Sequence, residues 1–453
     1  MGNEFKDYLN EGKDYYKKND LEKSIDSYTK AIDIDPQSTR AYCLRALSKG
    51  LLKDFIGTLE DCSKAIDINP NHEDAYFLRG CIKVKGLKDI DDGIEDLSKA
   101  IVINPSNAKN YIERGAIKLY DKDDFKGAIE DLTKAIEIKP NYEDAYFDRG
   151  FAKRLLNDLD GAIEDYSKAI EINPKFELAY EYRGSTKNKL KDHKGAISDY
   201  NKVLEINPNS SDAYCDRGSS KMELEKIFGA IKDFSKAIKI NPKCETAYIN
   251  RGLAKHEWNY LDGAIDDFNK AIEINPNSFD SYFSMAQCKK YWKDFEGAIE
   301  DYSKAIEINP NSFETFFFRG ECNDDLEKHN DAIEDYSKAI EINPKCETLY
   351  ISRGLAKHWL NDFDGAIDDF TKSIEINPNS SYAYCERGSS KEKLNDFDGA
   401  IEDYSKAIKV DSTNYSPYLH RGRAKHHLGN IEGSKKDFAF YNQKKDAKRK
   451  TLH

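Results

Sequence analysis

Cysteine, histidine and acidic side chains are the groups in this 453-residue chain that could bind a metal or catalyse a reaction. The nine cysteines are odd in number and form no CxxC motif, which indicates free thiols in a reducing compartment. None of the nine histidines lies at a metal-ligand spacing from a cysteine or a second histidine. The frequent Glu-Asp pairs, such as Glu164-Asp165, are typical of solvated or paired helix faces and not of a general acid/base dyad. No P-loop, GxSxG or HExxH motif occurs, so we expect no enzyme activity, no metal and no cofactor.

The composition argues against several other classes of protein. Charged residues make up 34% of the chain and apolar residues only 39%, which is too little to fill the thick cores of a globular enzyme of this length. Aromatic residues reach 12%, so the chain is not disordered. No apolar run approaches the roughly 20 residues of a membrane helix, and the start has no secretory hydrophobic region. We therefore expect a cytoplasmic protein that does not contact a membrane.

Proline and glycine reveal a tandem repeat. Eleven of the twelve prolines, from Pro36 to Pro378, recur at intervals of 34 or 35 residues, and 21 of the 26 glycines occupy two positions per interval. Such a period is typical of a helical repeat array. Thirteen units fit into residues 5–448, which leaves a basic C-terminal tail, 449–453, and no room for a catalytic domain. The units begin near residues 5, 39, 73, 108, 143, 177, 211, 245, 279, 313, 347, 381 and 415.

One full unit, residues 143–176, predicts two helices. Apolar residues at helical spacing between Ala145 and Leu156 predict the first helix, and a second such pattern runs from Gly161 to Ile172. Asn157-Asp158 separates the two helices, and Pro174 ends the second because the residue before a proline is disfavoured in a helix. In units such as 209–211 a serine is placed to cap the next first helix.

This pattern resembles the tetratricopeptide repeat (TPR). The resemblance rests on the 34-residue period, on its thirteenfold recurrence and on Tyr146, Gly150, Ala162, Tyr166, Ala169 and Pro174 of the quoted unit. It implies an all-α solenoid of antiparallel helix pairs, stacked into a right-handed superhelix whose concave groove is lined by the first helices. It also implies a non-enzymatic scaffold for protein–protein interaction that binds a protein or peptide segment.

One position departs from the family pattern. The residue before the first glycine is usually leucine in the family, but here it is arginine in eleven units, as at Arg149. An aspartate such as Asp165 follows sixteen residues later in most units, whereas unit nine places Met285 opposite Asp301. We predict an ion pair between the two helices of each repeat. The alternative is an arginine ladder that binds anionic ligands.

The first helices suggest a binding surface. The position after the first aromatic residue is apolar in twelve of thirteen units, and these side chains either pack against the next unit or form a stripe that accepts a partner's side chains. Around them, units five to twelve place fourteen acidic and four basic residues on the same helix face. We therefore expect a groove that attracts a basic segment, more weakly at high salt. The candidate groove residues are Asp144, Phe147, Asp148, Phe151, Asp212, Asp216, Ile249, Asn250, Leu253, Phe283, Phe317, Glu321, Ile351 and Leu355.

Other partners remain as alternatives. Many family members hold the C-terminal carboxylate of a chaperone with a Lys/Asn/Arg clamp, but Asn250 is the lone matching residue among Asp148, Asp216 and Glu386, so we do not expect that type of binding. An RNA-binding helical-repeat protein is a second hypothesis, although an acidic groove repels phosphates and we expect no nucleic acid. A third hypothesis is an accessory subunit of an enzyme complex.

Overall fold

The computed structural model describes the backbone of residues 2–450 and the side chains of residues 3–445. Within this range the regular structure is entirely α-helical and comprises 26 helices in tandem, which confirms the predicted fold class of paired helices. Contacts between Cα atoms divide the chain into two compact parts, Met1–Lys226 and Ile227–His453. The division falls inside the seventh repeat, in the turn between its two helices.

The N-terminal part holds six complete helix pairs and the first helix of the seventh repeat. Its helices are α1 (Gly2–Lys17), α2 (Leu21–Ile34), α3 (Thr39–Leu51), α4 (Phe55–Ile68), α5 (Glu73–Leu87), α6 (Ile90–Ile103), α7 (Ala108–Tyr120), α8 (Phe125–Ile138), α9 (Glu143–Leu155), α10 (Leu159–Ile172), α11 (Glu177–Lys189), α12 (His193–Ile206) and α13 (Ser211–Met222).

The C-terminal part holds the second helix of the seventh repeat and six further helix pairs. Its helices are α14 (Ile227–Ile240), α15 (Glu245–Glu257), α16 (Leu261–Ile274), α17 (Phe279–Tyr291), α18 (Phe295–Ile308), α19 (Phe313–Asp325), α20 (His329–Ile342), α21 (Glu347–Trp359), α22 (Phe363–Ile376), α23 (Ser381–Lys393), α24 (Phe397–Val410), α25 (Ser416–His427) and α26 (Ile431–Lys450).

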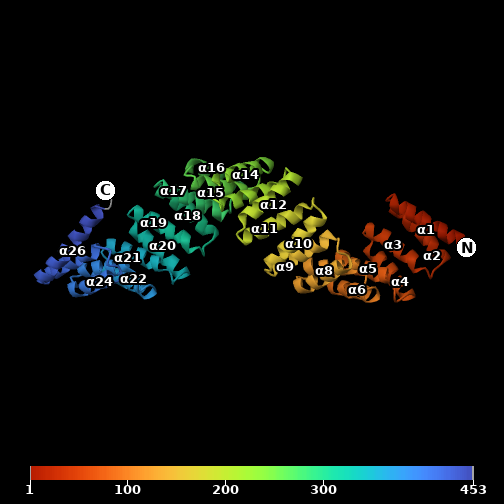
Figure 1. The fold of residues 1–453 in the computed structure, drawn as a ribbon, viewed down its shortest axis with the longest axis horizontal. Coiled ribbons are helices and arrows are strands. Elements are labelled where there is room, and N and C mark those ends of the chain that lie inside the picture. The colour runs from red at the N-terminus through yellow and green to blue at the C-terminus, as the bar shows by residue number, and fades with distance from the viewer. Residues whose placement is uncertain (1, 451–453) are drawn as a thin grey trace. The chain divides into compact units, whose positions relative to one another are not determined.

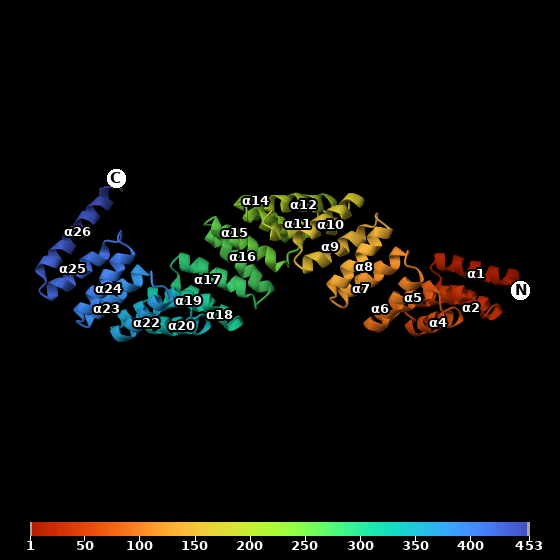
Figure 2. The ribbon, with the colours of Figure 1, turned by 60° about the horizontal axis from the view of Figure 1, so that its bottom comes forward.

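Within each part, every helix packs against the next one in sequence (Figures 1 and 2). Alanines are buried where the helices approach one another, and Ala162 and Ala169 are both 0% exposed. One continuous cluster of buried side chains extends from Ala169 through Tyr180 to Ala213, and it therefore spans three consecutive repeats. A single repeat is too thin to bury its apolar side chains alone, so stacking of neighbours supplies the core.

Both repeated glycines have a structural reason in the fifth repeat. A Cβ atom at Gly150 would lie 3.0 Å from the ring of Tyr166, so the first glycine lets α9 approach α10 closely. The carboxylate of Asp158 caps α10 by accepting a hydrogen bond from the backbone N–H of Gly161 at 3.1 Å. A Cβ atom at Gly161 would lie 2.3 Å from that carboxylate, so the second glycine makes room for the cap.

The observed helix ends agree with those predicted from the sequence in most repeats and differ from them in two places. Ser210 caps α13 as predicted, accepting from the N–H of Ala213 at 3.2 Å. The inserted residue of the third repeat lengthens α5, which runs to Leu87 and is followed by Lys88 in the left-handed conformation (φ 62°). Helix α26 spans Ile431–Lys450 and so runs past the predicted end of the array at 448, because no proline follows to end it. The side chains of the predicted tail 449–453 lie outside the described residues.

Candidate functional site

The repeated arginine links three side chains, as Arg149 on α9 illustrates. Its Nε and Nη2 atoms donate to the two carboxylate oxygens of Asp165 on α10, at 2.9 and 2.6 Å. Its Nη1 atom donates to the hydroxyl of Thr133 in the preceding repeat at 3.1 Å, and its guanidinium lies 5.6 Å from the ring centroid of Tyr146. Lys153 adds a second ion pair to Asp165 at 2.8 Å. The arginine therefore connects the two helices of its own repeat and also contacts the repeat before it.

The predicted Arg–Asp pair is confirmed in ten repeats. Besides Arg149–Asp165, Nη2–Oδ1 distances of 2.5–2.8 Å join Arg45–Asp61, Arg79–Asp96, Arg114–Asp131, Arg183–Asp199, Arg251–Asp267, Arg319–Asp335, Arg353–Asp369, Arg387–Asp403 and Arg421–Asp437. In each of these the arginine Nη1 also donates to a serine or threonine one repeat earlier. These arginines are engaged within the protein, which argues against a ladder for anionic ligands.

The ninth repeat lacks this arrangement. Met285 replaces the arginine, and Asp301 is 7% exposed. Lys289 lies 2.7 Å from Oδ2 of Asp301, but without the geometry of a hydrogen bond. Burial raises the pKa of Asp301, and Lys289 offsets only part of that effect.

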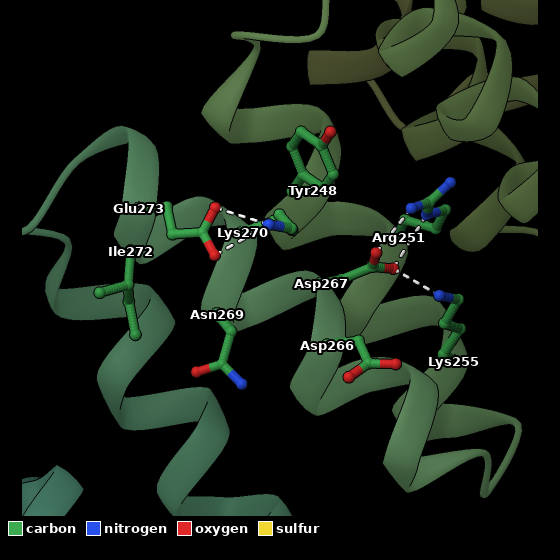
Figure 3. Close-up of a pocket in the computed structure, with 9 residues that line it drawn as sticks. All are labelled: Tyr248, Arg251, Lys255, Asp266, Asp267, Asn269, Lys270, Ile272 and Glu273. Atoms are coloured by element: carbon green, nitrogen blue, oxygen red, sulfur yellow. Dashed lines mark hydrogen bonds and ion pairs between the residues drawn. The ribbon is translucent and has the colours of Figure 1, made fainter.

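A pocket of about 810 Å³ lies over α15 and α16 of the eighth repeat (Figure 3). Arg251 and Lys255 both point at Asp267 there, at 2.6 and 2.8 Å. Lys270 is paired with Glu273 at 2.6 Å. The charged groups that face the pocket are thus largely paired with one another, and its lining shows no site for a specific ligand.

Chemically reactive groups do not gather elsewhere among the described residues. The cysteines are free thiols, and burial raises the pKa of Cys43 and Cys322 to about 12. No group of three or more His, Cys, Asp or Glu side chains in the described part of the chain could hold a metal ion. None of the helices described here combines the length and the apolar character that crossing a membrane requires.

Aromatic side chains cluster on the first helices of the N-terminal part. The ring centroid of Phe147 lies 5.4 Å from that of Tyr182 on α11, and Phe151 lies 5.4 Å from Tyr182 and 6.0 Å from Tyr120 on α7. Phe147 and Phe151 are half-buried, while Tyr120 is 54% exposed. These two predicted groove residues therefore pack between repeats and also remain partly accessible.

Acidic side chains lie on the same face of α9, α11 and α13. Asp148 accepts a hydrogen bond from the hydroxyl of Tyr120 at 2.6 Å, and burial raises its pKa to about 6. Burial, with a smaller contribution from Asp212, likewise raises the pKa of Asp216 to about 6. The pKa of Glu181 is raised by burial and by the nearby charges of Asp216 and Asp212. Asp144 and Asp212 are exposed.

The candidate residues of the C-terminal part occupy several environments. Phe283 and Phe317 contact Phe318 at centroid distances of 5.9 and 5.3 Å, and Glu321 forms an ion pair with Lys290. Ile249 packs against the core cluster around Leu261 and Phe268. The remaining candidates are half-buried or, for Leu253, exposed: Asn250, Leu253, Ile351 and Leu355.

Comparison with protein families confirms the relationship suggested by the repeat. Models described as "TPR repeat" and "Tetratricopeptide repeat" match residues 12–50, 118–153, 143–176, 179–210, 211–244, 245–278, 279–312, 313–346, 348–380 and 381–414, well over half of the chain. The chain belongs to the tetratricopeptide repeat family. TPR proteins generally mediate protein–protein interactions and are generally not enzymes.

Several solved structures are similar to parts of the chain. MamA is 28% identical and covers 37% of this chain and 97% of its own, with a TM-score of 0.36. A TPR protein from Parabacteroides merdae is 23% identical, over 56% of this chain and 99% of its own, with a TM-score of 0.45. YrrB, described as a TPR protein with an unusual peptide-binding site, is 20% identical over 41% of this chain and 95% of its own, with a TM-score of 0.37. No curated protein matches the sequence.

The sequence-based prediction missed two aromatic residues that contact the candidate groove phenylalanines. Tyr182 and Phe318 stand two positions after the first aromatic residue of their repeats, whereas the predicted stripe used the position directly after it. Both rings contact the candidate phenylalanines of the preceding repeat, at 5.4 Å for Tyr182–Phe147 and 5.9 Å for Phe318–Phe283. The sequence could have indicated these residues, because the position two after the first aromatic residue becomes Tyr or Phe in repeats six and ten.

Proposed function

We propose that this TPR protein is a non-enzymatic scaffold that binds a basic protein segment on the exposed face of its first helices. The observation that carries the proposal is the group of acids on α9, α11 and α13. Burial holds the pKa values of Asp148 and Asp216 near 6, so these carboxylates are partly desolvated and have too little compensating positive charge. A lysine or arginine from a partner would supply that charge.

The apolar side chains beside these acids support a peptide as the ligand. Phe147, Phe151 and Tyr182 present partly exposed rings next to Asp148, and aromatic faces attract cations as well as apolar groups. An extended or helical segment with alternating basic and apolar residues would contact both kinds of side chain. Nucleic acid phosphates would instead be repelled by the same carboxylates.

Selection from a phage-displayed library of dodecapeptides tests the proposal. We expect the enriched peptides to be rich in lysine or arginine. Binding of a selected peptide, measured by fluorescence anisotropy, should weaken about fivefold when NaCl rises from about 50 to about 300 mM. It should also weaken between pH 7 and pH 5, because Asp216 and Asp148 gain protons near pH 6 and lose their charge.

Matched variants locate the binding surface. Asp216→Asn should weaken binding about fivefold and reduce the pH dependence. Glu171→Gln is the control, because Glu171 is an exposed acid on the second helix α10 and is already paired with Lys168 at 2.7 Å. Enrichment of neutral or acidic peptides, or equal effects of the two substitutions, would contradict the proposal.

A further inference from the structure

Two hydrogen-bond donors in the fifth repeat are buried without an acceptor. Tyr166 is 0% exposed, and no described residue forms a hydrogen bond with its hydroxyl. The Nε atom of Arg154 is also buried and has no acceptor among the described residues. A buried donor without a partner costs free energy, so such groups call for an explanation.

Comparison between repeats shows what the hydroxyl does in the tenth and twelfth repeats, whereas in the ninth repeat the hydroxyl of Tyr302 is buried without an acceptor among the described residues, like that of Tyr166. Tyr336 donates to Asp324 at 2.9 Å, and Tyr404 donates to Glu392 at 2.9 Å, in each case a carboxylate twelve residues earlier. The residue at that earlier position in the fifth repeat is Arg154, which has no atom that can accept a hydrogen bond.

The choice of tyrosine follows the earlier residue throughout the sequence. Tyrosine occurs opposite a polar or aromatic hydroxyl-bearing side chain in six repeats, as Tyr16–Tyr28, Arg154–Tyr166, Asn188–Tyr200, Lys290–Tyr302, Asp324–Tyr336 and Glu392–Tyr404. Where the earlier residue is glycine, apolar or histidine, the later one is cysteine, leucine or phenylalanine. The hydroxyl at this position therefore occurs only in repeats whose earlier residue is Tyr, Arg, Asn, Lys, Asp or Glu.

The ninth repeat indicates what is missing beside Arg154. Lys290 holds the same position there, and it forms an ion pair with Glu321 of the next repeat. The residue that corresponds to Glu321 in the sixth repeat is Ser185, which accepts a hydrogen bond from Nη2 of Arg154 at 3.3 Å. The cation of the ninth repeat thus has a carboxylate from its own chain, whereas Arg154 has only a neutral hydroxyl at that place.

The surroundings hold Arg154 next to Tyr166. The guanidinium of Arg154 lies 5.5 Å from the ring centroid of Tyr182, which in turn lies 6.2 Å from that of Tyr166. Burial raises the pKa of Tyr166, and the positive charge of Arg154 opposes that shift. Asp148 belongs to the same cluster, but it accepts from Tyr120 and, among the described residues, forms no ion pair with Arg154. Arg154, Phe151 and Tyr182 are only half-buried, so this cluster borders the solvent.

We propose that Arg154 and Tyr166 form a subsite for one carboxylate side chain of the bound segment. Arg154 would donate to it through the guanidinium and Tyr166 through the hydroxyl. At the equivalent positions of other repeats, Lys290 forms an ion pair with Glu321, and Tyr336 donates to Asp324. The inference rests on the proposed function, and it adds that the basic segment carries one aspartate or glutamate that fixes its register on α9–α11.

The library selection also tests this subsite. The enriched dodecapeptides should share one acidic residue among their basic ones. Replacing that acid of the peptide by its amide should weaken binding to the unaltered protein about tenfold. The same change in the peptide should weaken binding to the Arg154→Met or Tyr166→Phe protein by less than about twofold. Basic peptides with no fixed acid, or an equal effect of the amide in all three proteins, would overturn the subsite while leaving the proposed function intact. Enrichment of no basic peptide at all would overturn both.

Thermal unfolding without any peptide supplies an independent control. Tyr166→Phe should leave the melting temperature unchanged or raise it, since it removes a hydroxyl without an acceptor. Tyr336→Phe is the matched variant and should lower it, since its hydroxyl donates to Asp324 at 2.9 Å. Equal losses in both variants would show that the hydroxyl of Tyr166 has an acceptor inside the protein, and this would also overturn the subsite.

Discussion

Arg149 donates hydrogen bonds from all three of its guanidinium nitrogens, two to Asp165 and one to Thr133. The side chains of Arg149 and Asp165 are only 16% and 4% exposed, so neither charge is well solvated. Burying an ion pair costs desolvation free energy, and the direct attraction and the added hydrogen bonds offset that cost only while both partners are present. Loss of one member alone should therefore lower the free energy of unfolding more than the intact pair raises it.

Single and double substitutions measure this dependence. Asp165→Asn should lower the free energy of unfolding by about 3–5 kcal/mol, because it leaves the charge of Arg149 buried without a carboxylate. Arg149→Met should cost less, because Lys153 still lies 2.8 Å from the carboxylate of Asp165. The double variant should lose clearly less than the sum of the two, as measured by urea denaturation. The exposed pair of Lys168 and Glu171 is the control, and Lys168→Met should cost at most about 0.5 kcal/mol. Additive losses would refute the coupling.

At this scale the sequence predicted contacts within a repeat better than contacts between repeats. The spacing of sixteen residues identified Arg149 and Asp165 as partners because it brings the facing positions of two antiparallel helices together. The hydrogen bond from Tyr120 to Asp148 joins residues 28 positions apart in different repeats. Its formation depends on the rotation of one helix pair against the next, which hydrophobic periodicity does not specify.

Among the first helices, two lack the arginine: α1 carries Glu11 at this position, and α17 carries Met285. No guanidinium reaches back from Met285 to Asn269, the residue that corresponds to Thr133 of the fourth repeat. Asp301 is left with Lys289 alone, and burial raises its pKa. We infer that the contact between α16 and α17 is weaker than its counterparts in the C-terminal part.

Met285→Arg should strengthen this contact. The new guanidinium would pair with Asp301 and lower its pKa, and it would reach the side chain of Asn269, so the free energy of unfolding should rise by about 1 kcal/mol. Slower amide hydrogen exchange in α17 would report the change locally.

Ser284→Arg is the control for Met285→Arg, because it adds the same charge one position earlier on the same helix. Faster exchange in Met285→Arg, or an equal gain in both variants, would show that the missing arginine does not weaken α17.

The helix boundaries were predictable wherever the sequence contains a terminator or a cap. Helix α10 ends at Ile172, two residues before Pro174, and α9 ends near the predicted interruption at 157–158. Helix α26 runs past its predicted end at 448 because the sequence there has helix-forming lysines and no proline or glycine.

In the molecule as a whole, each repeat contacts its sequence neighbours through the same few positions. The family and fold class were therefore predictable, because one repeated pattern determines every interface. The binding surface was less predictable, because the aromatic positions of the first helices serve packing and exposure at once. Phe147, for example, packs against Tyr182 and still remains partly accessible.

The link from each arginine to the preceding repeat makes the repeats interchangeable. Arg387 donates to Thr371, and Arg353 donates to Ser337, so deletion of residues 347–380 would bring Arg387 to Ser337, which also offers a hydroxyl. We expect the shortened protein to fold with one unfolding transition and proportionally less helical circular dichroism. Deletion of 347–363, half a repeat, is the control and should abolish folding of the adjoining helices. An aggregated product from the full-repeat deletion would contradict this expectation.

The same interchangeability bears on how such a gene grows. Residues 242–258 and 344–360 are near copies, PKCETAYINRGLAKHEW and PKCETLYISRGLAKHWL. Unequal recombination between these two segments adds or removes a whole multiple of 34 codons. The new junction inherits an arginine that fits the hydroxyl ahead of it, because Arg251 donates to Ser235 and Arg353 donates to Ser337. Array length can therefore vary between descendants of the gene without a compensating mutation at the new boundary.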